Sequence, residues 1–324
     1  MSLEGTGLNF EGTSAGEFGA RVQALRSRGT KVMISVGGAS TPDNTVSWNS
    51  FNAAAAAAFV QDFGLDGIDI DFQPDKPGER GPRLWIVIAM FSWHLRAQNG
   101  GSCLVHQAWM ARLENRCPAW RGARSSQCLN RSCSQPPLHA PCGVSPTTGL
   151  MTCAVDEQFQ NIVLQYRSSL AATGCKLLSA ALWSSGAWGQ APYENLGVGS
   201  PQTGLSINML KAVGSNLDFI NVLSYNGGPD FNYTAAYQAY KSFFPGIVLL
   251  GMQVAPEYDG TALQISGVNA LSSTVRGLGG AGLFLFSFSK GAVGGASATD
   301  ISQAVCRNFQ LGDCTASIPR STVQ

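Results

Sequence analysis

The feature that most constrains the fold is a short run, residues 68–73, in which apolar and polar residues alternate without a break. One face would carry Ile68, Ile70 and Phe72, and the other would carry Asp69, Asp71 and Gln73. Because successive residues of a strand point to opposite sides, the run predicts a strand with two carboxylates and an amide on one face. Charged groups inside a protein are costly unless they form a site. This strand is therefore expected to carry function.

Strands and helices alternate along most of the chain, which predicts a parallel α/β sheet. Further strands are expected at residues 7–10, 31–36, 176–183, 219–225, 247–253 and 282–288, and helices at residues 15–28, 52–63, 156–172, 207–213, 233–244 and 263–278. Without residues 76–154 the chain has 245 residues, close to the ~250 of a (β/α)8 TIM barrel. We therefore expect one split barrel domain formed by residues 1–75 and 155–324.

Residues 76–154 differ from the rest and are expected to form an irregular insertion. They hold nine basic and two acidic residues, against 12 and 18 elsewhere, together with six of the nine cysteines and four of the seven tryptophans. No helical or strand period is sustained. The segment is open to three interpretations: a poorly ordered insertion, translated non-coding sequence, or a basic insert that binds an anionic partner.

The cysteines and histidines give no metal signature. No CxxC pair occurs, so a zinc site is not expected although His94, His106 and His139 share the insertion. No cofactor is expected. Cys306 and Cys314 form either a disulfide, in an oxidising compartment, or two free thiols.

Partners are constrained mainly by what the sequence lacks. No apolar run reaches the ~20 residues of a membrane span, and no signal peptide is visible at the N-terminus. We expect neither a membrane nor a nucleic-acid partner. The oligomeric state is not predicted.

Three segments resemble motifs of glycoside hydrolase family 18, the chitinase family. Residues 66–73, DGIDIDFQ, resemble the DxxDxDxE signature, with Gln73 in place of the glutamate that donates the proton. Residues 35–38, SVGG, are similar to the SxGG motif that ends the family's third strand, and residues 223–226, LSYN, to the MxYD/N motif of its sixth. The resemblance implies a TIM barrel, with or without its first strand, and with the insertion after the fourth strand.

The resemblance also implies roles for individual side chains. Asp71 would orient the 2-acetamido group of the substrate and stabilise the positive charge that this group develops. Asp69 would share a proton with Asp71, because two close carboxylates do not both ionise cheaply. The Tyr225 hydroxyl would hold the acetamido oxygen, and Asp66 would be structural.

Further sugar contacts are carried over to residues at the ends of other strands. The expected substrate-binding residues are Ser35, Gly37, Gly38, Asn226, Gln253 and Phe286. Phe286 stands where the family has a tryptophan, and a phenyl ring offers less stacking area. Five more aromatic residues either line outer subsites or pack in the core: Trp183, Trp188, Tyr193, Phe231 and Tyr233.

Gln73 decides the expected activity. In family 18 the substrate supplies its own nucleophile, so the enzyme must supply a proton, and a carboxamide cannot. Losing a positioned general acid costs roughly 10²–10⁴-fold in rate. The resemblance therefore implies an extracellular, chitinase-like protein that binds chitin or N-acetylglucosamine oligosaccharides, with hydrolysis lost or strongly reduced. Two alternatives stay open: an active chitinase seen as an acid-to-amide variant, and a non-sugar interaction or inhibitor protein on the same barrel.

Overall fold

A computed structural model describes residues 14–38, 48, 51–73, 88–91, 142–145, 149–197, 200–228, 230–254, 263–286 and 291–315. The chain groups into two compact units, Met1–His94 with Leu138–Gln324, and Leu95–Pro137. The second unit lies outside the described residues, and so does the strand predicted at residues 7–10. All described residues belong to the first unit.

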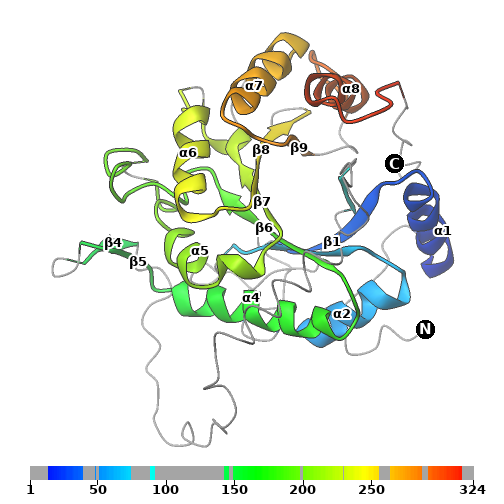
Figure 1. Ribbon diagram of the computed structural model, residues 1–324, viewed down its shortest axis with the longest axis horizontal. Coiled ribbons are helices and arrows are strands. Elements are labelled where there is room, and N and C mark those ends of the chain that lie inside the picture. Colours follow the sequence, from blue (N-terminus) through cyan, green and yellow to red (C-terminus); the bar gives the residue numbers. More distant parts are fainter. Residues whose placement is uncertain are drawn as a thin grey trace, which may run out of the picture. The chain divides into compact units, whose positions relative to one another are not determined.

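The centre of this unit is a sheet of seven strands in the order β3-β1-β2-β6-β7-β8-β9 (Figure 1). The six parallel strands are β1 (Lys31–Gly37), β2 (Gly67–Asp71), β6 (Leu177–Trp183), β7 (Phe219–Leu223), β8 (Ile247–Gln253) and β9 (Leu283–Phe286). The seventh strand, β3 (Ile88–Phe91), pairs antiparallel with β1. The chain thus forms an α/β half-barrel, which confirms the architecture predicted from the alternation.

Helices cover the outside of this sheet: α1 (Ala15–Arg26), α2 (Ala53–Asp62), α4 (Asp156–Ala171), α5 (Ile207–Val213), α6 (Tyr233–Phe243), α7 (Ile265–Gly277) and α8 (Ala298–Phe309). From α2 onward each packs against the next. Several begin at a side-chain cap. Ser14 and Glu17 form a capping box at α1, and Asn52 accepts a hydrogen bond from the Ala55 amide at α2.

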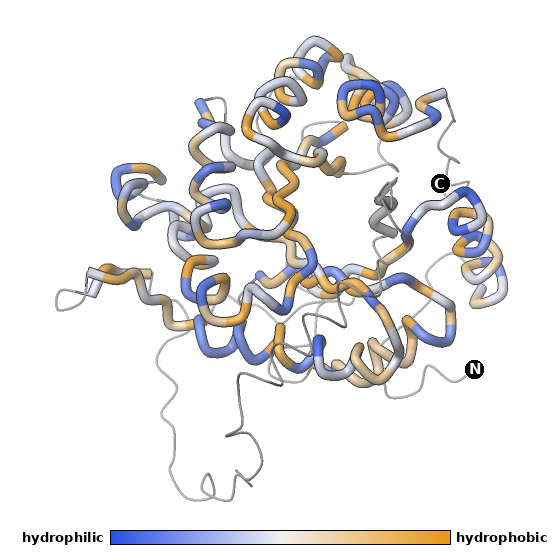
Figure 2. Tube along the Cα trace, in the orientation of Figure 1, coloured by the Kyte–Doolittle hydropathy of each residue, from blue (hydrophilic) through white to orange (hydrophobic). Residues whose placement is uncertain are grey.

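The two faces of the sheet differ in composition. Side chains at alternate positions, such as Ile34, Ile68 and Ile70, are buried beneath the helices. On the inner face, Met33, Phe219 and Leu249 form a separate small apolar cluster. Figure 2 shows hydrophobic colours concentrated on the strands and mixed colours on the helices. The period of two predicted for β2 therefore extends to its neighbours, as expected for a barrel wall.

Some elements were not predicted from the sequence. They are helix α8, strand β3, the hairpin of β4 (Gly143–Val144) and β5 (Met151–Thr152), and the disulfide Cys142–Cys153 beside that hairpin. Cys306 and Cys314 form a disulfide, which decides between the two predicted alternatives. The strand predicted for residues 219–225 ends earlier, since Ser224–Asn226 forms a 3-10 turn, η3. In the described part of the chain, none of the helices is long and apolar enough to cross a bilayer.

Candidate functional site

The candidate site lies on the inner face of the sheet, toward the carboxyl ends of its parallel strands. Strand register places Ser35 of β1 beside Asp69 of β2, and Asp69 beside Ser179 of β6. One step toward the carboxyl ends, Asp71 lies between Gly37 and Ala181. Polar side chains therefore line the inner face near the carboxyl ends of the strands, whereas the apolar side chains of Met33, Phe219 and Leu249 line it nearer the amino ends. In parallel α/β folds this is the end where sites form.

Asp69 is buried and receives hydrogen bonds from three strands. The Ser35 hydroxyl donates to its Oδ2 at 3.1 Å, the Asn221 amide donates to its Oδ1 at 3.0 Å, and the Ser179 hydroxyl also donates to Oδ1. Burial raises the pKa of Asp69, and the three hydrogen bonds oppose that rise. The sharing of a proton between Asp69 and Asp71 stays a prediction, because the hydrogen bonds seen at Asp69 run to β1, β6 and β7.

Asp71 and Gln73 lie on the same face and contact each other. The Gln73 side-chain amide donates to Asp71 Oδ1 at 3.1 Å. The pKa of Asp71 is raised from 3.8 to about 7: burial is the largest cause and raises it, the hydrogen bond from Gln73 opposes the rise, and the charge of Asp69 adds to it. Gln73 is half-buried. The residue at the position of the family's acid therefore acts here as a hydrogen-bond donor to a carboxylate with a perturbed pKa.

The carboxyl end of β1 contacts the carboxyl end of β2. The Gly38 amide donates to the Asp71 carbonyl at 2.9 Å. Gly37 has a φ of +110°, and a Cβ built there would lie 2.2 Å from the Asp71 carbonyl oxygen and 2.4 Å from the Trp48 ring. Buried Trp48 donates its indole N–H to the Gln73 carbonyl at 3.1 Å. The glycines of the SVGG segment thus permit close approach of β1, β2 and Trp48.

Tyr225 lies just after β7, on η3, where the preceding residue, Ser224, is hydrogen-bonded to β8 and the Tyr225 ring packs on β9. The Ser224 hydroxyl donates to the Gly251 carbonyl and accepts from the Gly251 amide, each at 2.8 Å. The Tyr225 ring stacks on Phe286, with centroids 5.6 Å apart and planes 10° apart, and meets the edge of Phe284 at 5.9 Å. The rings of Tyr225 and Phe286 therefore form one aromatic unit across the ends of three strands.

The other predicted residues take different positions. Gln253 is half-buried at the end of β8, in register with Phe286 of β9. Asn226 lies on η3, and its side chain is outside the described structure. Asp66 lies at the opposite, amino end of β2, where it accepts from the Val32 amide at 2.9 Å and pairs with Arg26 and Lys31. This position agrees with a structural role.

The additional aromatic residues are largely packed. Trp188 and Phe231 are buried and contact each other at 5.2 Å, and Phe231 meets Tyr233 edge-on at 5.1 Å. This arrangement favours packing over an outer subsite for Trp188 and Phe231. Trp183 and Tyr193 are partly exposed.

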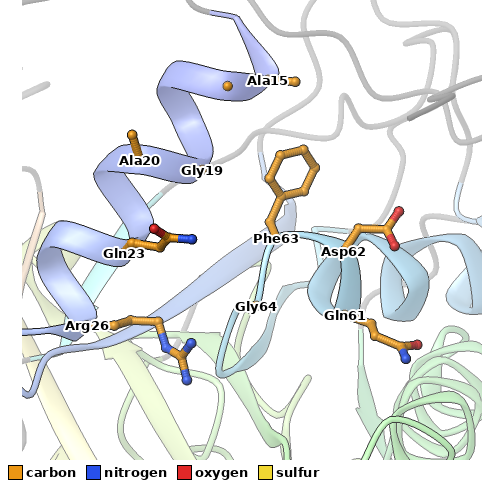
Figure 3. Close-up of a pocket in the computed structure, with 10 residues that line it drawn as sticks. Ala15, Gly19, Ala20, Gln23, Arg26, Gln61, Asp62, Phe63 and Gly64 are labelled. Atoms are coloured by element: carbon orange, nitrogen blue, oxygen red, sulfur yellow. The ribbon is translucent and has the colours of Figure 1, made fainter.

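A cavity of about 580 Å³ lies elsewhere, between α1 and the end of α2 (Figure 3). It is lined by small residues of α1 together with Gln23, Arg26 and Phe63. Arg26 connects this region to Asp66 at the amino end of β2. The cavity is therefore associated with the end of the strand away from Asp71, and we place the candidate site at the polar row instead. No cluster of three or more potential metal ligands occurs among the described residues.

Sequence reasoning missed four residues that shape this site: Ser179, Asn221, Trp48 and Ser224. Their signal is weak in isolation, because single serines and asparagines occur on many strands. For Ser179 and Asn221 the usable signal was the alternation of inward and outward positions along a strand. Both stand at the inward positions of strands that were correctly predicted.

The order of the strands permits a comparison with a complete barrel. SVGG lies on β1, the acidic row on the adjacent β2, and Tyr225 beyond β7, with β6 between them. These positions agree with the third, fourth and sixth barrel strands. Fold and motif positions resemble those of glycoside hydrolase family 18. Two barrel strands that would precede β1 have no counterpart among the described residues.

Comparisons with known proteins give fold-level likenesses. No family model and no curated protein matches the chain. Similar solved structures include a family 18 chitinase from Crocus vernus (13% identity, 93% of this chain and 77% of that chain, TM-score 0.46). A second is catalytic domain 2 of a group II chitinase from Ostrinia furnacalis (14% identity, 95% of this chain and 84% of that chain, TM-score 0.47). A third is a xylanase and alpha-amylase inhibitor protein from Scadoxus multiflorus (15% identity, 94% of this chain and 83% of that chain, TM-score 0.46).

Proposed function

We propose that this protein is a chitinase-like lectin that binds chitin or N-acetylglucosamine oligosaccharides and hydrolyses them very slowly or not at all. The observation that carries the proposal is the hydrogen bond from Gln73 to Asp71. Asp71 is an acceptor suited to an acetamido N–H, and the side chain beside it has no proton to give to a leaving oxygen. The disulfides Cys142–Cys153 and Cys306–Cys314 support an extracellular location.

The geometry supports retained binding for two reasons. Gln nearly matches Glu in shape, so replacing the acid leaves the position of Asp71 supported by a neutral donor. The Tyr225–Phe286 pair presents stacked aromatic rings beyond β7 and β9, and aromatic faces suit the apolar face of a pyranose ring. Hydrolysis additionally needs a proton at the leaving oxygen, and an amide does not supply one.

The test combines binding and turnover on the same protein. Calorimetric titration of the unmodified chain with chitopentaose should show binding, while incubation with chitopentaose should release little or no shorter sugar. Gln73→Glu should raise the rate of release by about 10²–10⁴-fold, the usual contribution of a general acid. Adding Asp71→Asn to Gln73→Glu should abolish this gain.

Three outcomes would count against the proposal. Rapid hydrolysis by the unmodified chain would show that position 73 does not limit turnover. An unchanged rate in Gln73→Glu would mean that a further part of the catalytic site is missing. Absence of chitopentaose binding would favour a protein that recognises a non-sugar partner.

A further inference from the structure

The surroundings of Asp69 differ from those of the structural carboxylate Asp66, which pairs with two charged side chains, Arg26 and Lys31. Its side chain is 5% exposed, and its three hydrogen-bond donors come from three different strands. All three donors, Ser35, Ser179 and Asn221, are neutral. Two of them converge on a single oxygen, Oδ1, while Ser35 serves Oδ2. This set of donors matches the acceptor geometry of an ionised carboxylate.

We propose that Ser179 and Asn221 are positioning residues of the candidate site: by filling Oδ1 of Asp69 they hold that carboxylate toward β6 and β7 and leave Asp71 to pair with Gln73. The arrangement presents Asp71 to an incoming acetamido group before the ligand arrives. This inference rests on the proposed sugar-binding function, because it specifies how one residue of that site is oriented.

The physical reason is competition for hydrogen bonds. Asp69 and Asp71 lie two residues apart on one face of a strand, about 7 Å along the chain. A buried carboxylate without donors would take up a proton or share one with its neighbour. Sharing would draw Asp71 toward Asp69 and away from Gln73. With Ser179 and Asn221 in place, Asp69 has donors of its own.

Asn221 adds a second observation. It is 3% exposed, and its carbonyl Oδ1 has no hydrogen-bond partner among the described residues, while its amide nitrogen donates to Asp69. An unpaired buried carbonyl costs free energy. Tolerating that cost keeps the amide nitrogen on Asp69. The orientation fits a residue placed for its donor.

Other charges on the elements packed around β2 are engaged elsewhere. Lys31 of β1 pairs with Asp66, and Arg167 of α4 pairs with Asp218. Asp156 of α4 accepts from the amides of Cys153 and Asn208, Glu157 is exposed, and Asp62 of α2 lines the cavity beside α1. Strand β6 presents no ionisable side chain. Asp69 is accordingly the charge that acts on Asp71.

The experiment is a carboxyl carbon NMR titration of the ligand-free full chain, with Asp71→Asn used to assign the signals. Ser179→Ala and Asn221→Ala, tested separately, each remove one donor. Each should raise the higher titration midpoint of the Asp69–Asp71 pair by about one pH unit, because the doubly ionised state loses a hydrogen bond. Affinity for chitopentaose at pH 6.5 should fall about 10-fold.

Controls separate positioning from general destabilisation. Ser179→Thr keeps the hydroxyl and should restore the midpoint and the affinity. Ser272→Ala removes another fully buried serine hydroxyl, on α7, that has no hydrogen-bond partner in the part of the chain that the structure describes. It should leave both readouts unchanged.

The two readouts also separate this inference from the proposed function. Unchanged midpoints in both Ser179→Ala and Asn221→Ala would overturn the inference, whatever the binding. Shifted midpoints in a chain that binds no chitopentaose at any pH would support the arrangement of the carboxylates and refute the sugar-binding function.

Discussion

Replacing Asp71 with asparagine tests whether the site stores a destabilising charge. Burial raises the pKa of Asp71 from 3.8 to about 7, so the folded chain holds this proton more tightly than the unfolded chain. Below pH 3.8 both states are protonated and the group contributes nothing. Between pH 3.8 and 7 only the unfolded chain ionises, so the free energy of unfolding falls as the pH rises, and above pH 7 the loss is complete.

The size of this loss follows from the pKa shift. Each unit is worth about 1.36 kcal/mol, so the whole rise corresponds to a penalty on the order of 4 kcal/mol if the charge were fully shielded from water. Asp71 is only half-buried, and solvent screening reduces the penalty. We expect Asp71→Asn to raise the free energy of unfolding by about 2 kcal/mol at pH 8.5. At pH 4.5 the gain should be much smaller.

Urea unfolding of the wild type and Asp71→Asn at pH 4.5 and pH 8.5 measures this difference. Asn has nearly the shape of Asp, and Gln73 can turn its amide to keep a hydrogen bond. Asp230→Asn, which removes an exposed carboxylate from the loop before α6, controls for the loss of one surface charge. An equal gain at both pH values would show that packing is responsible, and no gain at pH 8.5 would refute the reasoning.

Two further predictions concern the scaffold. Gly37→Ala places a Cβ 2.2 Å from the Asp71 carbonyl oxygen at a φ of +110° and should lower the free energy of unfolding by about 1–3 kcal/mol; a urea midpoint equal to that of the wild type would contradict this. Arg167→Met leaves Asp218 without the partner that donates at 2.7 Å and should cost about 3 kcal/mol. Arg167→Met should cost less in an Asp218→Ala background than in the unmodified chain, as a double-mutant cycle would show.

Much of the fold could be predicted because its signals are local. The period of two identified β2, and the bounds expected for β8 and α5 match the structure. The C-terminal strand was also found, although residues 287–288 lie outside the described structure. Helix α8 was missed, even though Ser297 and Asp300 form a capping box at its start. The capping box and the amphipathic pattern of residues 298–309 are both local signals that favour a helix.

Strand β3 could not be predicted for a different reason. It pairs antiparallel with β1, a contact between distant residues that no local pattern specifies. The hairpin β4–β5 is only two residues long on each side. Strands this short carry no measurable period, and their pairing depends on the turn and the adjacent disulfide.

The site shows the same division between local and distant information. Asp69, Asp71 and Gln73 follow from alternation within one strand. The donors Ser179 and Asn221 reach Asp69 from strands 110 and 152 residues away. Strand register places Ser179 beside Asp69, but it places Asn221 beside Ala181, so the contact of Asn221 with Asp69 depends on the stagger of the sheet. A sequence pattern specifies which residues face inward, and the tilt of the strands decides which of them meet.

The cost of the buried charge favours a functional role for the row Asp69, Asp71 and Gln73, although Gln73 cannot act as a general acid. Ionised Asp71 destabilises the folded chain above its pKa, and a core selected for stability alone would be better served by an apolar residue there. Three strands nevertheless supply donors to Asp69, and Gln73 supplies one to Asp71. Hydrogen bonds reduce the cost of a buried charge without removing it. In the proposed function a ligand donates to Asp71 and offsets the remaining cost, so we expect binding and stability to respond in opposite directions to Asp71→Asn.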